Sequence, residues 1–132
     1  MFHLTVPGKP LPKGSLRHIG KGRMIEQTNV KQWMSVIRAH ATQATGAVLL
    51  PIETPVEARL EFRFPRPAAA KNRLYPHMRS VGDIDKLCRA VLDALQPEVI
   101  TDDSLVVRLS ASKDYETAEQ PAGVSIHIEE LT

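Results

Sequence analysis

Hydrophobic and polar residues alternate along several stretches of the chain. The clearest is VEARLEFRF at residues 56–64, where Val56 and every second residue after it are apolar and the residues between them are charged. A period of two sends alternate side chains to opposite faces of a strand, so this stretch predicts a strand with one buried face. Shorter alternations at residues 2–6, 105–111 and 124–128 predict further strands.

Two other segments repeat at the helical period. Thr28 is a candidate N-cap for the first, whose apolar residues recur every three or four positions up to Gly46. The second begins near Asp83 and is ended by Pro97. Its apolar side chains follow the i, i+3, i+4, i+7, i+8, i+11 pattern of one buried helix face: Ile84, Leu87, Cys88, Val91, Leu92 and Leu95.

These elements predict an α+β fold in the order β-α-β-α-β-β. The expected architecture is a small mixed β-sheet with two helices packed on it, in a single domain over residues 1–132. Proline and glycine mark the expected loops, at residues 7–14, 20–22, 51–55 and 65–82. In the third strand, the alternation directs four side chains inward: Leu105, Val107, Leu109 and Ala111.

Composition excludes several classes of protein. Hydrophobic residues make up 42% and charged residues 24%, as in ordinary soluble domains, and no apolar run reaches the length of a membrane span. The first residues lack the basic-then-apolar order of a signal peptide. The single cysteine, Cys88, excludes an internal disulfide framework, and the five scattered histidines offer no zinc-ligand spacing. We therefore expect a cytoplasmic protein, with Cys88 and Trp33 in its core.

The net charge of +2 conceals a strong asymmetry. Residues 1–81 hold 13 Lys and Arg against 4 Glu, a net of +9, whereas residues 82–132 hold 4 against 11 acids, a net of −7. Segments 8–23 and 63–79 contain no acid at all, and such basic loops attract polyanions, although solvated surfaces explain the charge alone equally well. The cations expected to contact a nucleic-acid backbone are Lys9, Lys13, Arg17, Lys21, Arg23, Arg66, Lys71, Arg73 and Arg79.

Aromatic residues make up only 5% of the chain, and none lies in the basic segment 8–23. Proteins that bind single strands usually stack the bases on aromatic side chains. The composition therefore favours recognition of a duplex through its backbone and shape.

The acidic residues are concentrated as strongly as the basic ones. Five of the six aspartates fall within residues 83–103: Asp83, Asp85, Asp93, Asp102 and Asp103. Each has a structural explanation. Asp83 can cap the second helix. The charged residues Asp85, Arg89 and Asp93 lie four apart, as in a surface ladder of ion pairs. The TDDS sequence at 101–104 is typical of a turn.

The same aspartates also suit a divalent cation. If the second helix packs on the sheet through its apolar stripe, its first turn can lie near the start of the 105–111 strand. That placement would bring Asp102 or Asp103 towards Asp83 and Asp85. Carboxylates without a histidine or thiolate partner suit Mg²⁺ or Mn²⁺, which can activate water for phosphoryl transfer. The spacing leaves the structural and the metal-binding interpretations both open.

The arrangement resembles the RusA-type endodeoxyribonucleases, which are Holliday-junction resolvases of bacteria and their phages. The family pattern is D-x-D-N-x-x-K, then D-A-L, then D-D before a hydrophobic strand. Its counterparts here are Asp83-Ile-Asp85, VLDAL at residues 91–95, and Asp102-Asp103. The resemblance implies a Mg²⁺-dependent enzyme that acts as a homodimer on branched double-stranded DNA and makes paired symmetric nicks in a four-way junction. We expect it in a bacterial cytoplasm, whether encoded by a bacterium or a phage.

The resemblance also implies roles for single residues. Asp83, Asp85 and Asp103 correspond to the metal ligands, with Asp93 and Asp102 in supporting positions. Two of the expected catalytic residues depart from the family pattern: Lys86 replaces the family's Asn, and Arg89 replaces its Lys. Arg89 can stabilise charge that develops on the phosphate, but it stays protonated and cannot shuttle a proton. Lys86 can take over a phosphate or water contact.

Two alternatives remain at this stage. One is a nuclease of broader specificity for branched DNA or RNA. The other is a non-catalytic nucleic-acid-binding module, whose aspartates serve only as caps and ion pairs. Asp85→Asn separates the classes, because it abolishes cleavage in a nuclease and leaves a binding module unchanged.

Overall fold

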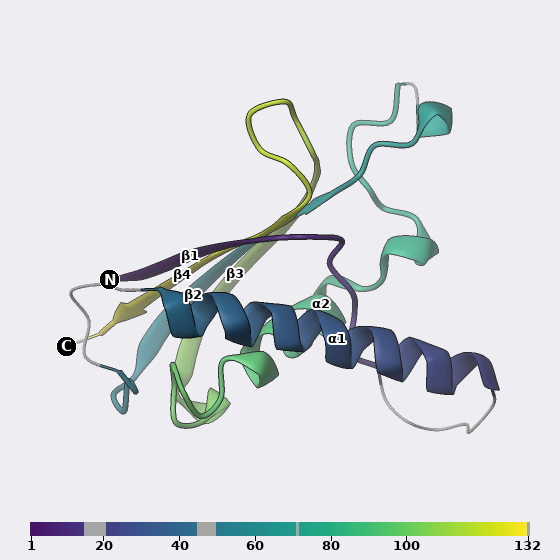
Figure 1. The fold of residues 1–132 in the computed structure, drawn as a ribbon. Coiled ribbons are helices and arrows are strands. Elements are labelled where there is room, and N and C mark those ends of the chain that lie inside the picture. The colour runs from purple at the N-terminus through teal and green to yellow at the C-terminus, as the bar shows by residue number, and fades with distance from the viewer. Residues whose placement is uncertain (15–20, 45–49, 71, 132) are drawn as a thin grey trace.

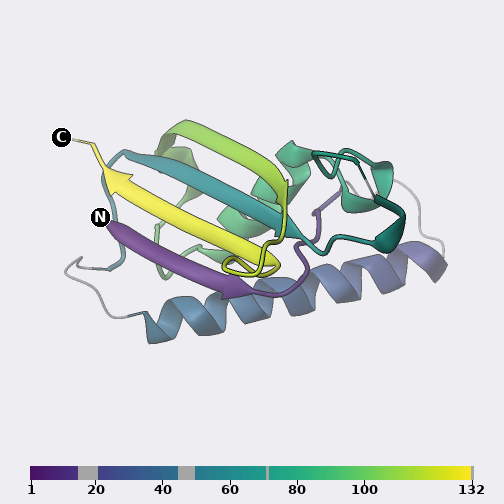
Figure 2. The same cartoon turned by 90° about the horizontal axis from the view of Figure 1, so that it is seen from above.

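The computed structural model describes residues 1–14, 21–44, 50–70 and 72–131, with side chains described for all of these except residues 21–28. A four-stranded mixed sheet carries both helices on one face (Figures 1 and 2). This arrangement and its element order confirm the predicted α+β fold. The elements are β1 (Phe2–Pro7), α1 (Lys21–Gln43), β2 (Val56–Phe64), α2 (Ile84–Ala94), β3 (Val106–Tyr115) and β4 (Gly123–Glu130), with short 3-10 turns η1 (Ala68–Ala70), η2 (Arg79–Val81) and η3 (Asp103–Leu105).

The strands lie in the order β1-β4-β2-β3. β4 pairs antiparallel with both β1 and β2, whereas β3 runs parallel to β2 and forms one edge of the sheet (Figure 2). A parallel pair needs a crossover, and the segment that contains α2 provides it. α1 packs against β1 and α2, and α2 packs against β3.

The core lies between the sheet and the helices. The predicted inward residues of β1, β2 and β4 are all buried, as are those of α1. On α2, the inner part of the predicted stripe is buried, but Ile84 is 38% exposed at its first turn. The side chains confirmed in the core include Phe2, Leu4, Val6, Val30, Trp33, Ile37, Leu60, Phe62, Leu87, Cys88, Val91, Ile126 and Ile128.

The predicted start of the first helix was wrong. α1 begins at Lys21, so Thr28 lies within it, and residues 21 and 22 are helical rather than part of a loop. The segment 21–27 has one weak helix former, Gly22, among residues of good helical propensity, and it contains no proline. A single glycine costs about 1 kcal/mol relative to alanine, which does not stop a long helix.

The predicted inward face of β3 was also wrong in part. Leu105 precedes the strand in η3, and Ala111 is half-buried, but Val107 is 59% and Leu109 49% exposed. Val107 falls at a register shift between β2 and β3, where β3 has one residue more than its partner. α2 contacts β3 but leaves these two side chains open to solvent, so apolar alternation here does not mean burial.

Arg63 is another residue whose environment the alternation misjudged. It stands on the polar side of β2 but is only 5% exposed. Its guanidinium donates hydrogen bonds to the Pro121 carbonyl oxygen (3.0 Å) and to Ser125 Oγ (2.9 Å). The connection between β3 and β4 therefore folds over this cation and removes it from the solvent-accessible basic surface. In the described part of the chain, no helix is long and apolar enough to cross a membrane.

Candidate active site

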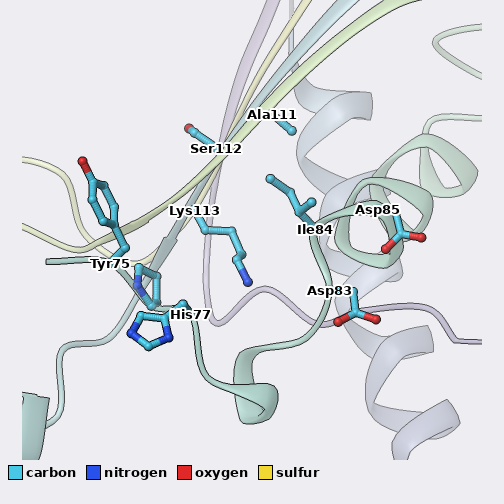
Figure 3. A pocket seen from close by; sticks show the side chains of 9 residues that line it. Tyr75, His77, Asp83, Ile84, Asp85, Ala111, Ser112 and Lys113 are labelled. Carbon is cyan, nitrogen blue, oxygen red and sulfur yellow. The ribbon is translucent and has the colours of Figure 1, made fainter. Parts of the chain in front are cut away.

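A hollow of about 520 Å³ opens where three segments meet (Figure 3). These segments are the loop at residues 75–77, the first turn of α2, and the second half of β3. Both aspartates of the D-x-D sequence line the hollow. Its lining residues are Tyr75, Pro76, His77, Asp83, Ile84, Asp85, Ala111, Ser112 and Lys113.

Asp83 holds the N-cap position of α2 without acting as a cap. Its backbone is extended (φ −76°, ψ 141°), as an N-cap requires, but its side chain accepts no capping hydrogen bond. The carboxylate is 71% exposed and lies 3.4 Å from Lys86 Nζ. The sequence-based N-cap explanation therefore accounts for the position of Asp83 and not for its side chain. Asp85, in the first turn of α2, is also exposed, so both carboxylates have oxygens free to bind a ligand.

The entry to α2 is fixed by contacts from distant segments. Gly82 has a positive φ of 91°, and a Cβ atom there would lie 2.6 Å from Pro12 Cγ. Lys113 Nζ donates a hydrogen bond to the Gly82 carbonyl oxygen at 3.0 Å. The Lys13 amide donates to the Lys86 carbonyl oxygen at 3.0 Å. The N-terminal loop and β3 thus position the two aspartates from opposite sides.

Lys113 is a site residue that the sequence analysis missed. It faces the helix side of the sheet beside Phe62, and its ammonium group points into the hollow between His77 and Asp83 (Figure 3). A signal was present, because extending the alternation of Leu109 and Ala111 by two residues places a lysine on the inward face. An inward lysine at the edge of a sheet indicates a polar cavity or a charged partner. His77 also lines the hollow, where the sequence had assigned it no role.

The structure separates Asp102 and Asp103 from the other carboxylates, which contradicts the predicted approach. α2 begins beside the middle of β3 and runs back along it for 11 residues, or about 16 Å. The chain then turns through η3 into the start of β3 (Figure 1). Val106 and Ser112 are therefore about 20 Å apart along the strand, and Asp103 lies at the far end from the hollow.

Asp102 acts as the turn residue that its sequence predicts. Its carboxylate accepts a hydrogen bond from the Ser104 amide at 2.9 Å, at the N-cap of η3. Hydrogen bonding from the Ser104 side chain, and then from its amide, favours the charged form and lowers the pKa of Asp102 below its usual value. Within the described residues, no group of three or more His, Cys, Asp or Glu side chains is placed to hold a metal ion.

The predicted ladder of Asp85, Arg89 and Asp93 does not form. Asp93 instead accepts from Lys13 Nζ at 2.7 Å, and among the described residues Arg89 has an ion pair with neither aspartate. Arg89 is exposed and does not line the hollow, whereas Lys86 lies beside Asp83. Asp93 therefore ties the N-terminal loop to α2.

The predicted DNA-contacting cations are in several different environments. Lys9 and Arg79 are exposed, and Lys13 is held by Asp93. The Arg66 guanidinium stacks on Tyr115 at 4.7 Å from the ring centroid and donates to the Arg73 carbonyl oxygen at 2.8 Å. Arg17 and Lys71 lie outside the described residues, and Lys21 and Arg23 are placed on α1 by their backbone only.

The Cys88 thiol is a structural neighbour of the site. It is 3% exposed and faces the core one helical turn after Asp85. Burial, followed by the nearby Asp85 charge, raises the pKa of the Cys88 thiol to about 11. The thiol is therefore protonated near neutral pH and is neither a metal ligand nor a nucleophile.

No protein of curated function matches the chain significantly. A profile of the family described as Endodeoxyribonuclease RusA matches residues 7–129, and the match includes the hollow, both basic loops and the Asp102-Asp103 turn. Because the match covers nearly all of the 132 residues, this chain belongs to the RusA family of endodeoxyribonucleases.

Proposed function

We propose that the chain is a Mg²⁺-dependent endonuclease that resolves four-way DNA junctions in the bacterial cytoplasm by paired symmetric nicks. The observation that carries the proposal is that Asp83 and Asp85 line one hollow with Lys113. Both aspartates are exposed, and the Asp83 side chain makes no capping hydrogen bond. Asp102 and Asp93, by contrast, are engaged by a turn hydrogen bond and by an ion pair. Asp85 has no such partner among the described residues, and Asp83 has one solvent-exposed ion pair, with Lys86 at 3.4 Å.

The donor set fits Mg²⁺ in kind but is incomplete within one copy. Carboxylate oxygens are the ligands that Mg²⁺ prefers, and this ion keeps several waters, so two protein carboxylates suffice for weak binding. Asp103, the third ligand implied by the family pattern, lies at the opposite end of β3 and can join only from a second copy of the chain. This is one reason to propose a homodimer. When bound, the ion supplies an activated water and offsets charge on the phosphate.

The chain's own residues prepare the DNA for this chemistry. Asp83 and Asp85 hold the acidic centre, and Lys86 and Lys113 lower the repulsion between that centre and an incoming phosphate. Exposed cations on both loops, such as Lys9 and Arg79, attract the DNA backbone. Arg89 lies on the outer face of α2, where it can contact a flanking phosphate. It does not reach the hollow of its own chain.

The first test is cleavage of an end-labelled four-way junction beside a linear duplex of the same sequence, with Mg²⁺ and with EDTA. We expect symmetric nicks on the junction that EDTA abolishes. Cleavage of flaps or RNA at similar rates would replace junction resolution with a broader nuclease. Tight junction binding without a nick in either condition would favour the non-catalytic binding module.

The residue-level test is Asp85→Asn. We expect cleavage to fall to background while junction binding is kept or tightened, because a negative charge facing the phosphates is removed. Calorimetry should also show weaker Mg²⁺ binding, which is independent of turnover. The control is Asp114→Asn, an exposed aspartate of β3 outside the hollow, which should leave both properties unchanged. Full cleavage by the Asp85 variant contradicts the proposed site.

A further inference from the structure

Leu74 and Tyr75 form an exposed apolar pair in the connection between β2 and α2. Five of the chain's six Phe, Trp and Tyr side chains are buried, whereas Tyr75 is 59% exposed. Leu74 is 78% exposed, more than any other large hydrophobic side chain in the described part of the chain. Neither side chain is removed from water by folding, so the pair contributes little to the stability of the chain. Its apolar area is available to another molecule.

The residues on either side of the pair are held in place. Before it, the Arg73 carbonyl oxygen accepts a hydrogen bond from the Arg66 guanidinium at 2.8 Å. After it, Pro76 is buried, and the His77 amide donates to the Tyr75 carbonyl oxygen at 3.0 Å. The backbone of the pair is therefore ordered before a ligand arrives, which lowers the entropic cost of binding.

The pair lies beside the proposed active site. The connection that carries it projects past the end of the sheet (Figure 1). Tyr75 lines the hollow on the side opposite Asp83 and Asp85 (Figure 3). When a DNA phosphate lies at these carboxylates, a base of the same or the next nucleotide can therefore contact Tyr75.

The charge around the pair favours a nucleic acid as its ligand. Segment 63–79 contains no acidic residue, Arg79 is exposed, and Lys113 lines the same hollow as Tyr75. A base presents an apolar face, and the phosphates on either side of it are negative. An apolar pair among cations is complementary to both.

We propose that Leu74 and Tyr75 act as a wedge that contacts unstacked bases at the branch point of a DNA junction and so makes the site selective for branched DNA. The inference rests on the proposed function, since it names the residues that select the substrate of the same site. Apolar side chains can enter a base step, and aromatic rings stack on any base. At a branch point the stack is already interrupted, so opening it costs less than in a continuous duplex.

A wedge is compatible with the low aromatic content of 5%. Proteins that bind single strands stack successive bases on several aromatic side chains. With one exposed aromatic ring, this chain can stack on one base, while the duplex arms are held through their backbones. Tyr75 thus supplies selectivity for branched DNA, and the basic residues supply most of the affinity.

Binding to DNA molecules of different structure tests the wedge. In an Asp85→Asn background, which keeps the DNA intact, dissociation constants are measured for a linear duplex, a fully paired four-way junction and a junction with unpaired thymines at its centre. We expect Tyr75→Ala to weaken binding to the junction with the unpaired centre about tenfold, as the loss of one stacked base does. Binding to the linear duplex should change less than about twofold, because no base is unstacked there.

Matched variants define which property of the pair matters. Leu74→Ala should weaken junction binding in the same way, and Tyr75→Phe, which keeps the ring, should bind like the parent protein. The control is Val36→Ala, an apolar residue of α1 with 38% exposure, which should change none of the dissociation constants. Far-UV circular dichroism checks that every variant folds.

Permanganate, which oxidises unstacked thymines, reports on the DNA itself. Binding of the Asp85→Asn protein should raise the reactivity of thymines at the centre of the paired junction at least about threefold. The double variant Leu74→Ala, Tyr75→Ala should remove this increase. Equal weakening of binding to all three DNA molecules would make the pair a general DNA contact, and unchanged binding would leave it for a protein partner. Either result overturns the inference.

Cleavage separates this inference from the proposed function. A chain that cleaves no DNA but prefers the unpaired centre through Tyr75 rejects the nuclease and keeps the wedge. A Leu74→Ala, Tyr75→Ala variant that cleaves junctions at the wild-type rate and leaves linear duplex intact keeps the nuclease and overturns the wedge.

Discussion

Lys113 brings a positive charge into a hollow in which the D-x-D sequence places two carboxylates. Its Nζ atom is fixed by the Gly82 carbonyl oxygen at 3.0 Å, so its position is set before DNA arrives. We expect Lys113→Ala to lower the cleavage rate on the order of 100-fold, as removal of one preorganised donor does in other enzymes. Junction binding should change little, because most contacts are made elsewhere. Single-turnover kinetics measure the first effect and filter binding the second.

Two variants define the role of Lys113. Lys113→Arg should recover part of the rate, because it keeps the charge. Lys31→Ala on the exposed side of α1 should cleave like the wild type. An Ala variant that cleaves normally shows that Lys113 only supports the Gly82 backbone.

His127 makes the stability of the chain depend on pH. Burial lowers its pKa, the charges of His3 and Arg59 act in the same direction, and Glu61 opposes them. The ring lies 4.4 Å from the His3 ring and 3.4 Å from Glu61 Oε1. Because the folded state binds the proton more weakly than the unfolded state, stability is full above the usual pKa of 6.5 and is lost as the pH falls towards the folded pKa.

His127→Asn should therefore lose less stability than the wild type between about pH 7 and pH 5. Urea unfolding at both pH values measures the difference. If the free energy of unfolding falls equally in the variant and the wild type, groups other than His127 cause the acid sensitivity. His40→Asn, on α1, serves as the control.

At the scale of elements, the turn that enters α2 is the most constrained point of the site. Gly82→Ala must adopt a positive φ of 91° and place its Cβ 2.6 Å from Pro12 Cγ. We expect a loss of roughly 1–3 kcal/mol in the free energy of unfolding, and weaker Mg²⁺ binding as Asp83 is displaced. Gly14→Ala, which meets no atom within 4 Å, should cost far less. Chemical denaturation measures the free energy of unfolding of both variants. Equal losses in Gly82→Ala and Gly14→Ala would refute the steric argument.

The elements also show where sequence patterns succeed. Hydrophobic periodicity predicted all four strands, both helices and the inward faces of β1, β2 and β4. It failed for Val107 and Leu109, because a period of two shows which residues share a face and not whether anything covers that face. It also placed the start of α1 too late, because the apolar stripe becomes regular only at Val30 while the backbone is helical from Lys21.

At the scale of the whole molecule, binding to DNA is an electrostatic property of the basic surface. Arg79 is exposed in η2, just before the D-x-D sequence. If it contacts a phosphate, Arg79→Ala should reduce the slope of log K against log salt by about 0.9. Junction binding measured over a series of salt concentrations tests this, with Lys31→Ala as the control. An unchanged slope removes Arg79 from the proposed DNA surface.

The fold class, the core faces of most elements and the two carboxylates at the start of α2 could all be predicted from the sequence. These follow from local periodicity and from neighbours in the chain, which a sequence records directly. The folded chain was needed to show that Lys113 joins Asp83 and Asp85, and that Lys13 engages Asp93. It was also needed to show that Asp103 lies far from the hollow. The reason is the direction of the chain. Because α2 runs back along β3, the two ends of the acidic segment 83–103 lie far apart, while residues distant in sequence lie close together. No local pattern encodes that reversal.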